Sequence, residues 1–284
     1  MRLTNACAAI TIGLCCTAFL NSQASGQNPP HPDSGAGEKT FHWPQGKRAA
    51  LSLSFDDARL SQIDTGLELL QKCGVHVTFY VNPDGVEKRL EGWKRVVASG
   101  HEIGNHTMTH PCTGNFAWSR DNALENYSLQ MMAKEMDDLN AEIQRLLGVK
   151  PTTFAYPCGQ KFVGRGGGVK SYVPLVAERF IVGRGYYDEP TNDPVFTDLA
   201  QATGTAFDDM DNIQMIKLVS KAADEGRWVI FVGHEIGKRG FQTTDTTALQ
   251  ALCKYALDPA NHLWVDTVEN VGKYILEQRA GSKK

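Results

Sequence analysis

Two aspartates and three histidines in this chain have the types and spacing needed for metal-assisted hydrolysis. Asp56 and Asp57 are adjacent, His106 and His110 are four residues apart, and His234 follows an apolar run. Two imidazoles and one carboxylate form the N,N,O ligand set of a catalytic zinc, which leaves positions open for water and substrate. A second carboxylate can then take a proton from water, and a third imidazole can protonate a leaving group.

Each of these features also has a plain structural explanation. An Asp-Asp pair after a strand is often a turn or a helix N-cap, an H-x-x-x-H spacing arises by chance, and a single histidine can be a satisfied core residue. Thr107 stands where the H-E-x-x-H zinc protease motif has glutamate, which excludes that motif. The functional interpretation therefore depends on whether the fold brings these side chains together.

The apolar pattern from residue 49 onward is typical of alternating strands and helices. The expected strands cover residues 49–55, 76–81, 102–105, 153–156, 180–183, 228–232 and 263–265. The expected helices cover residues 62–73, 87–99, 128–147, 172–178, 212–224, 244–257 and 268–278. Strands separated by single helices imply parallel βαβ units, in an open doubly wound sheet or in a closed or partly closed barrel. In both arrangements the carboxyl ends of the strands carry the chemistry, and the five candidate residues follow such ends.

Four segments of the chain resemble the motifs of the polysaccharide deacetylases, the NodB-homology domain of carbohydrate esterase family 4. In chain order they are SFDD at 54–57, HTMTH at 106–110, FAYPCG at 154–159 and VGH at 232–234. The resemblance extends over about residues 41–278. It implies an α/β fold, the distorted (β/α)7 barrel of that family.

The resemblance also implies a role for each of the five residues. Asp56 would be the catalytic base and His234 the catalytic acid, while Asp57, His106 and His110 would bind Zn²⁺, or Co²⁺ or Ni²⁺, which the same ligands suit. Metal-bound water would attack the acetyl carbonyl of an N-acetylated glycan such as a chitin-like or peptidoglycan chain. The expected activity is thus metal-dependent deacetylation of a polysaccharide or oligosaccharide.

The third motif is expected to bind the oxyanion and the substrate. Tyr156, Pro157 and Cys158 are its candidate residues, with a backbone N–H near Cys158 facing the oxyanion. The motif departs from the family at Ala155, where an arginine usually steadies the base carboxylate. Arg184, at the end of the 180–183 strand, is the expected substitute.

The fourth family motif, an aspartate with a tryptophan, is missing at the expected place. In the family this aspartate orients the acid histidine. Asp208, Asp209 and Asp211 lie in about the right stretch, but no tryptophan accompanies them. The sequence therefore leaves the partner of His234 open.

The segment 111–127 is a polar loop that contains Phe116, Trp118 and Tyr127. Sugar rings stack on exposed aromatic faces, so we expect this loop, and Trp118 in particular, to line a glycan groove. The alternative is a loop that packs on itself against the barrel.

The amino-terminal part of the chain divides into a signal and a leader. Residues 1–24 have one charge, Arg2, then an apolar stretch too short to span a membrane, then an A-x-A-like site, which predicts a cleaved signal peptide. An uncleaved anchor or a lipidated cysteine is the alternative. Residues 25–40 are rich in Gly, Pro and Ser and predict a disordered leader, so the catalytic domain is expected at 41–280. If the signal peptide is cleaved, we expect a secreted or periplasmic protein that is not stably inserted in a membrane.

Four cysteines remain once the signal is removed, and the sequence allows three pairings among them. Cys73 and Cys253 lie in helical patterns and are expected to be buried apolar residues. Cys112 and Cys158 flank motif residues and are candidates for a disulfide.

Composition and charge limit the other functions. The 284 residues carry 29 Lys and Arg against 32 Asp and Glu, a net charge of −3, and no basic stripe, which argues against nucleic acid as a partner. An O-acetyl esterase of the acetylxylan type would use the same residues. A carbohydrate-binding protein with impaired catalysis is the alternative from another class, and an amidohydrolase acting on small cyclic amides fits the secretory signal poorly.

Overall fold

The structure, a computed structural model, describes residues 41–189 and 191–281. The signal peptide and the leader predicted for residues 1–40 lie outside them. Among the described residues, no helix combines the length and the apolar character that crossing a membrane requires.

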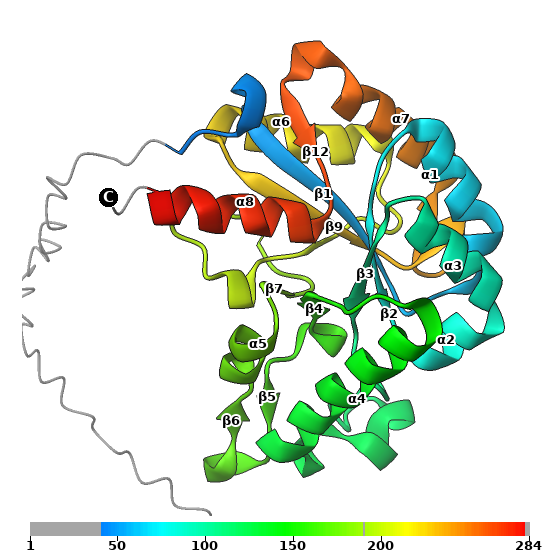
Figure 1. The fold of residues 1–284 in the computed structure, drawn as a ribbon, viewed down its shortest axis with the longest axis vertical. Coiled ribbons are helices and arrows are strands. Elements are labelled where there is room, and N and C mark those ends of the chain that lie inside the picture. Colours follow the sequence, from blue (N-terminus) through cyan, green and yellow to red (C-terminus); the bar gives the residue numbers. More distant parts are fainter. Residues whose placement is uncertain (1–40, 190, 282–284) are drawn as a thin grey trace, which may run out of the picture. The chain divides into compact units, whose positions relative to one another are not determined.

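A parallel sheet lies at the centre of the fold, with helices around it (Figure 1). Its strands are β1 (Ala49–Asp56), β2 (Thr78–Val81), β3 (Glu102–Asn105), β4 (Thr153–Ala155), β7 (Val182–Arg184), β8 (Thr205–Ala206), β9 (Trp228–Gly233) and β12 (Leu263–Val265). The order is β7-β4-β3-β2-β1-β9-β8, and β12 also pairs with β1. All seven predicted strands are therefore present, and the two-residue β8 is an addition.

The sheet curves into a distorted barrel. The first part of β1 (residues 49–51) pairs with β12, and its last part (residues 54–56) pairs with β2 on the same edge. At one end of the sheet β7 forms a bridge with Ala202, and at the other end β8 pairs with β9, so the short segment 202–206, which includes β8, connects β7 with β9. This arrangement confirms the predicted α/β fold of the (β/α)7 type.

Eight α-helices surround these strands in the described part of the chain. They are α1 (Leu67–Cys73), α2 (Pro83–Lys88), α3 (Leu90–Ala98), α4 (Leu129–Leu147), α5 (Val173–Arg179), α6 (Asn212–Glu225), α7 (Thr246–Leu257) and α8 (Val268–Gly281). The prediction of one helix over 87–99 is wrong, because the chain leaves helical geometry at Arg89 (φ −138°, ψ 39°) and divides into α2 and α3. Gly148 ends α4 with φ 73°, a left-handed conformation that glycine adopts without a Cβ clash.

The sequence pattern did not predict two short pairs of strands. These are β5 (Phe162–Val163) with β6 (Lys170–Ser171), and β10 (Glu235–Gly237) with β11 (Thr243–Asp245). Strands of two or three residues are too short to show an alternating pattern.

Alternation along β1 decides which of its side chains face the inside of the barrel. Leu51, Leu53 and Phe55 belong to the outer core, together with residues of α1, α6 and α7. Side chains alternate across a strand, so Ser52 and Asp56 lie on the other, inner face. The acidic residue at the end of β1 is therefore buried inside the barrel by the strand period itself.

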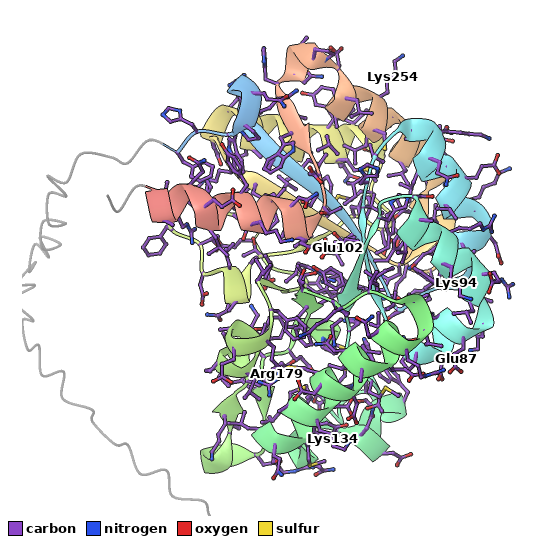
Figure 2. The ribbon with its side chains drawn as sticks, viewed as in Figure 1. Glu87, Lys94, Glu102, Lys134, Arg179 and Lys254 are labelled. Carbon is purple, nitrogen blue, oxygen red and sulfur yellow. A yellow bond between two sulfur atoms is a disulfide. The ribbon has the colours of Figure 1, made fainter. Side chains whose placement is uncertain are left out.

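The inside of the barrel is partly polar. Glu102 of β3 accepts hydrogen bonds from the Thr78 hydroxyl at 2.6 Å, from the Thr153 hydroxyl and from the backbone N–H of Glu269 at 2.9 Å. Figure 2 shows Glu102 among the strands, whereas labelled lysines such as Lys94 lie on the outer helices. Burial raises the pKa of Glu102 to about 7. One buried carboxyl group thus links β2, β3 and β4 to the start of α8.

Two cysteines in the helical layer carry free thiols. Cys253 of α7 is buried, as expected. Cys73, at the end of α1, is only half-buried, because the helix ends there and its last turn reaches the surface.

Candidate active site

Five side chains predicted to act together line one cavity of about 990 Å³. Asp56 ends β1 and Asp57 follows it, His106 and His110 follow β3, and His234 follows β9. Parallel strands end at the same edge of the barrel, and this places the five residues together although 178 positions of sequence separate the first from the last. The cavity lies at the carboxyl ends of the strands.

Asp57, His106 and His110 form a cluster suited to a metal ion. The Nε2 atoms of His106 and His110 each lie 3.5 Å from Asp57 Oδ1. One ligand atom from each of the three residues lies within 4.8 Å of the other two. This is an N,N,O set on one side of the cavity, and catalytic zinc sites use such sets.

The backbone of the His106–His110 segment is irregular rather than helical. A helical turn would place residues i and i+4 on one side, but Thr107 (φ 64°) and His110 (φ 52°) adopt left-handed conformations instead. The Asn105 side chain accepts a hydrogen bond from Thr107 N at 2.9 Å, and the Thr107 hydroxyl accepts one from His110 N at 3.1 Å. These local bonds, rather than a helix, direct both imidazoles toward Asp57.

Both histidines direct Nε2 toward Asp57. His106 Nδ1 lies 2.9 Å from the carbonyl oxygen of Ala155, which only accepts hydrogen bonds, so Nδ1 carries a proton and Nε2 is the ring nitrogen that can bind a metal ion. Burial, together with the neighbouring His106, lowers the pKa of His110 to about 4. The residues therefore fit a divalent transition ion.

Arg59 holds the other oxygen of Asp57, a contact that the sequence interpretation did not include. Its Nε and Nη2 donate to Asp57 Oδ2 at 3.2 and 2.9 Å. This leaves Oδ1 directed at the two histidines. The signal available in the sequence was the position of Arg59, two residues after the first motif.

Arg184 supports Asp56 from inside the barrel. Arg184 and Asp56 are buried, and Arg184 Nη2 donates to Asp56 Oδ1. Its Nη1 donates to the carbonyl of Gly185 at 2.8 Å, and the guanidinium lies 4.9 Å from the centre of the Tyr80 ring. Arg184 thus makes the contact with the base carboxylate that the motif arginine makes in the family. Arg184 lies behind Asp56 and is not among the residues that line the cavity, so this geometry gives it no direct contact with a substrate.

Asp208 is the residue that contacts the acid candidate. Its Oδ2 lies 2.7 Å from His234 Nδ1, and its Oδ1 accepts hydrogen bonds from His234 N at 3.2 Å and from the Thr244 hydroxyl at 2.9 Å. Burial lowers the pKa of His234, but the hydrogen bond to Asp208 and the charges of Asp56 and Asp57 outweigh this effect and raise the pKa. Because Asp208 holds Nδ1, Nε2 is the ring nitrogen that can act in the cavity.

Gln62 joins the two catalytic candidates through their backbones. Its Nε2 donates to the carbonyl oxygens of Asp56, at 2.7 Å, and His234, at 2.8 Å. A polar residue in an otherwise ordinary helical pattern gave no sign of this role. The bond fixes the end of β1 against the end of β9.

The third-motif residues divide between the cavity and the core. Cys158 lines the cavity and is bonded to Cys112. Tyr156 and Pro157 are buried, and the Tyr156 hydroxyl donates to the carbonyl of Ala200 at 2.6 Å. Neither residue is among those that line the cavity, so this geometry does not place Tyr156 or Pro157 in direct contact with a substrate.

An aromatic surface borders the cavity beside His110. Trp118 is 63% exposed, stacks on Phe116 with the ring centres 5.4 Å apart, and lies 6.0 Å from the His110 ring. The same loop is also anchored internally, because the Ser119 hydroxyl bonds the backbone of Cys112. The loop therefore lines the cavity through Phe116 and Trp118 and also packs on itself, and its contact with a glycan stays a prediction. The sequence interpretation missed Tyr187 and Phe241, which are exposed and also line the cavity.

Parts of this chain are similar in sequence to known proteins. The polysaccharide deacetylase family model matches residues 44–163. A gellan lyase of a Bacillus species is 31% identical over 172 residues, which are 54% of this chain and 6% of that protein. Peptidoglycan-N-acetylmuramic acid deacetylase PdaC of Bacillus subtilis (strain 168) is 30% identical over 113 residues, 38% of this chain and 21% of that protein. The chain thus matches only a small part of either relative.

The fold is shared with solved structures. One from Mycobacterium smegmatis, assigned as a polysaccharide deacetylase, superposes with a TM-score of 0.61 over 84% of this chain and 94% of that chain, at 16% identity. At this identity the likeness concerns the fold. The polysaccharide deacetylase family model matches residues 44–163, which contain the first three of the four motifs, and this match confirms the resemblance.

Proposed function

We propose that this protein is a metal-dependent hydrolase that removes acetyl groups from an acetylated polysaccharide or oligosaccharide. One observation carries the proposal: a ligand trio, a buried carboxylate with its arginine and a histidine with its aspartate meet in a single cavity. Family membership supports the reaction class.

The trio of Asp57, His106 and His110 would hold the ion. Zn²⁺ fits these ligands, and Co²⁺ or Ni²⁺ is compatible with them. A divalent ion there would supply Lewis acidity, which lowers the pKa of a coordinated water and polarises a carbonyl. Arg59 would keep Oδ1 of Asp57 directed at the ion, since it binds Oδ2, the oxygen that faces away from the histidines.

Asp56 and His234 would move the protons. Arg184 binds Oδ1 of the Asp56 carboxylate and leaves Oδ2 toward the cavity, so Asp56 could accept a proton from the attacking water. His234 would donate its Nε2 proton to the departing amine or hydroxyl, because Asp208 holds Nδ1. The backbone N–H at Cys158 remains the candidate donor to the oxyanion.

The substrate class is proposed from the relatives and the rim. PdaC is named for deacetylation of peptidoglycan N-acetylmuramic acid, and we propose N-acetyl groups of an amino-sugar glycan for this chain. An O-acetyl ester, as in acetylxylan, would use the same groups. The binding-protein alternative is less well supported, because binding alone has no use for a base and an acid that are each held by a buried partner. With the predicted signal peptide, we propose a secreted or periplasmic enzyme.

Acetate release from a panel of N- and O-acetylated glycans tests the proposal. The wild-type protein is assayed as purified, after chelation and after zinc is added back, beside Asp56→Ala. We expect release that chelation abolishes, that zinc restores and that Asp56→Ala lacks. Release that survives chelation would refute the metal mechanism. No release from any glycan would favour the binding protein.

A further inference from the structure

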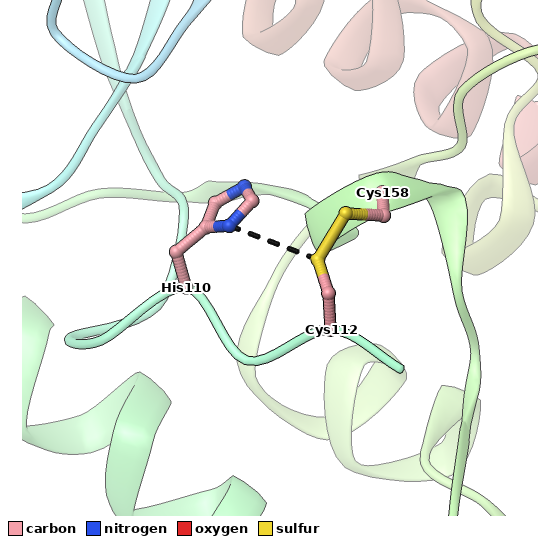
Figure 3. Close-up of side chains that lie close together, drawn as sticks. All are labelled: His110, Cys112 and Cys158. Atoms are coloured by element: carbon pink, nitrogen blue, oxygen red, sulfur yellow. Dashed lines mark hydrogen bonds between the residues drawn. A yellow bond between two sulfur atoms is a disulfide. The ribbon is translucent and has the colours of Figure 1, made fainter. Parts of the chain in front are cut away.

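The two histidines of the candidate metal centre differ in what holds their second ring nitrogen. His106 Nδ1 is bonded to a backbone carbonyl at 2.9 Å, whereas His110 Nδ1 lies 3.7 Å from the sulfur of Cys112 (Figure 3). A disulfide sulfur is a weak acceptor, so this contact orients an imidazole far less than a carbonyl does. His110 is also the more exposed of the two, with 23% of its side chain accessible against 2% for His106. Its position therefore needs another restraint.

The Cys112–Cys158 disulfide supplies a covalent restraint at that point. Cys112 comes two residues after His110, and Cys158 comes three residues after Ala155, whose carbonyl holds His106. The bond thus joins the loop after β3 to the turn after β4, the two segments that position the histidines. Cys112 is fully buried, with its sulfur against the His110 ring.

Backbone geometry at both ends of this link shows that the surroundings impose the local conformation. His110 has φ 52° and Cys158 has φ 54°, left-handed values that side chains with a Cβ adopt at an energetic cost. Such residues persist when neighbouring contacts determine their conformation. On the Cys112 side, Ser119 and Leu124 bond its backbone at 2.9–3.0 Å, so the sulfur is anchored rather than mobile.

We propose that the Cys112–Cys158 disulfide is a positioning element of the metal centre. It holds the His110 imidazole with Nε2 toward Asp57, and metal affinity consequently depends on the oxidation state of these two cysteines. The inference rests on the proposed metal centre, since it concerns how one of its ligands is held.

Reduction of this bond is chemically simple and sterically accessible. Cys158 lines the cavity and is only partly buried, so we expect a small phosphine to reach the disulfide from this side. The phosphine attacks one sulfur and the S–S bond breaks; water then supplies the oxygen of the phosphine oxide and the two protons of the thiols. The two electrons pass from phosphorus to the cysteines.

The chain offers a matched control for the link. Gln160 Oε1 accepts a hydrogen bond from Thr113 N at 2.7 Å, so it joins the same two segments without a covalent bond and without touching His110. If any link between the segments were enough, Gln160→Ala would weaken metal binding as much as loss of the disulfide.

Zinc affinity of the metal-free protein, measured by calorimetry, tests the proposal. Contacts that orient a metal ligand are typically worth about 10- to 100-fold in affinity. We expect a loss of this size in the double variant Cys112→Ser/Cys158→Ser and a change of less than twofold in Gln160→Ala. Equal affinities of the double variant and the wild type would overturn the proposal. If the wild type binds no zinc, the proposed metal centre itself is wrong, which is a separate result.

A second measurement covers the case in which the serine pair does not fold. Cys112→Ala/Cys158→Ala places no hydroxyl at the buried position and replaces it in the titration. Wild-type protein reduced with phosphine in its folded state is also compared with oxidised protein by hydrogen exchange, without metal. We expect faster exchange in the peptide that contains residues 106–113. Unchanged exchange in this peptide would contradict a positioning role. A Cys73→Ala/Cys253→Ala variant, treated in the same way, shows whether the free thiols contribute to the change in exchange.

Discussion

The candidate site has an inner and an outer half that are built differently. The inner half, Asp56, His106 and Arg184, is buried and is held by strand ends, a backbone carbonyl and a buried ion pair. The outer half consists of Arg59, His110 and Trp118, which are partly exposed and held by loops and a disulfide. Strand ends and buried partners thus hold the inner half, whereas loops and the disulfide hold the outer half, so we expect substitutions in the inner half to cost more.

Substitution of the two candidate histidine ligands gives the largest expected effect. His106→Ala removes a ligand from a buried pocket that solvent cannot easily refill, so we expect zinc affinity to fall by more than about 100-fold, beyond the range seen for indirect contacts. His110→Ala acts at the open side, where water can replace the imidazole, and the loss should be smaller. Calorimetric titration of both variants measures this. Equal losses would remove the distinction between the halves.

The two arginines form a second matched pair. Arg184→Ala breaks a buried ion pair, so we expect kcat/KM to fall about 100-fold and the free energy of unfolding to drop by about 3–5 kcal/mol, with zinc affinity little changed. Arg59→Ala removes a half-exposed partner and should cost below about 1 kcal/mol of stability and tenfold or less in activity.

Acetate release and urea unfolding measure both quantities. Unchanged turnover in Arg184→Ala would contradict the role proposed for it as substitute for the motif arginine. A larger stability loss in Arg59→Ala than in Arg184→Ala would reverse the assignment of the halves.

The aspartate behind the acid predicts a change in pH dependence. Asp208 contributes to the raised pKa of His234, so Asp208→Asn lowers that pKa and the histidine loses its proton at lower pH. The alkaline limb of the kcat/KM profile should therefore move to lower pH, with about a tenfold loss above neutral pH and a smaller loss at pH 6. Asp209→Asn, in the adjacent turn, is the control. An alkaline limb that stays in place would exclude Asp208 as the partner.

The exposed tryptophan gives the smallest expected effect. Trp118→Ala should lower kcat/KM on a polymeric glycan by up to about tenfold, the range of one aromatic contact, and less on a short acetylated sugar that does not reach the loop. Phe196, also exposed but absent from the cavity lining, provides the control variant Phe196→Ala. The same loss on both substrates would favour a loop that only packs on itself.

Much of the inner half was predictable because it follows from local periodicity. The alternation of residues 49–56 predicts a strand. Because side chains alternate between its two faces, Asp56 lies on the face away from Leu53 and Phe55. Motif order then predicts that His106 and His234 join it. The path of the His106–His110 segment could not be predicted, because it depends on hydrogen bonds that the Asn105 and Thr107 side chains accept from the backbone rather than on a helical turn.

The sequence by itself determined the strand–helix alternation, the motif residues and the edge of the barrel at which they meet, because these depend on short-range patterns. Tertiary structure alone decided among equivalent candidates. Asp211 caps α6 and Asp209 occupies a left-handed turn, which leaves Asp208 to contact His234. Likewise, of the pairings that the four cysteines allow, the structure contains Cys112–Cys158, and the Cys112 sulfur lies beside His110. Such choices depend on distances between segments far apart in the chain, and no local pattern encodes them.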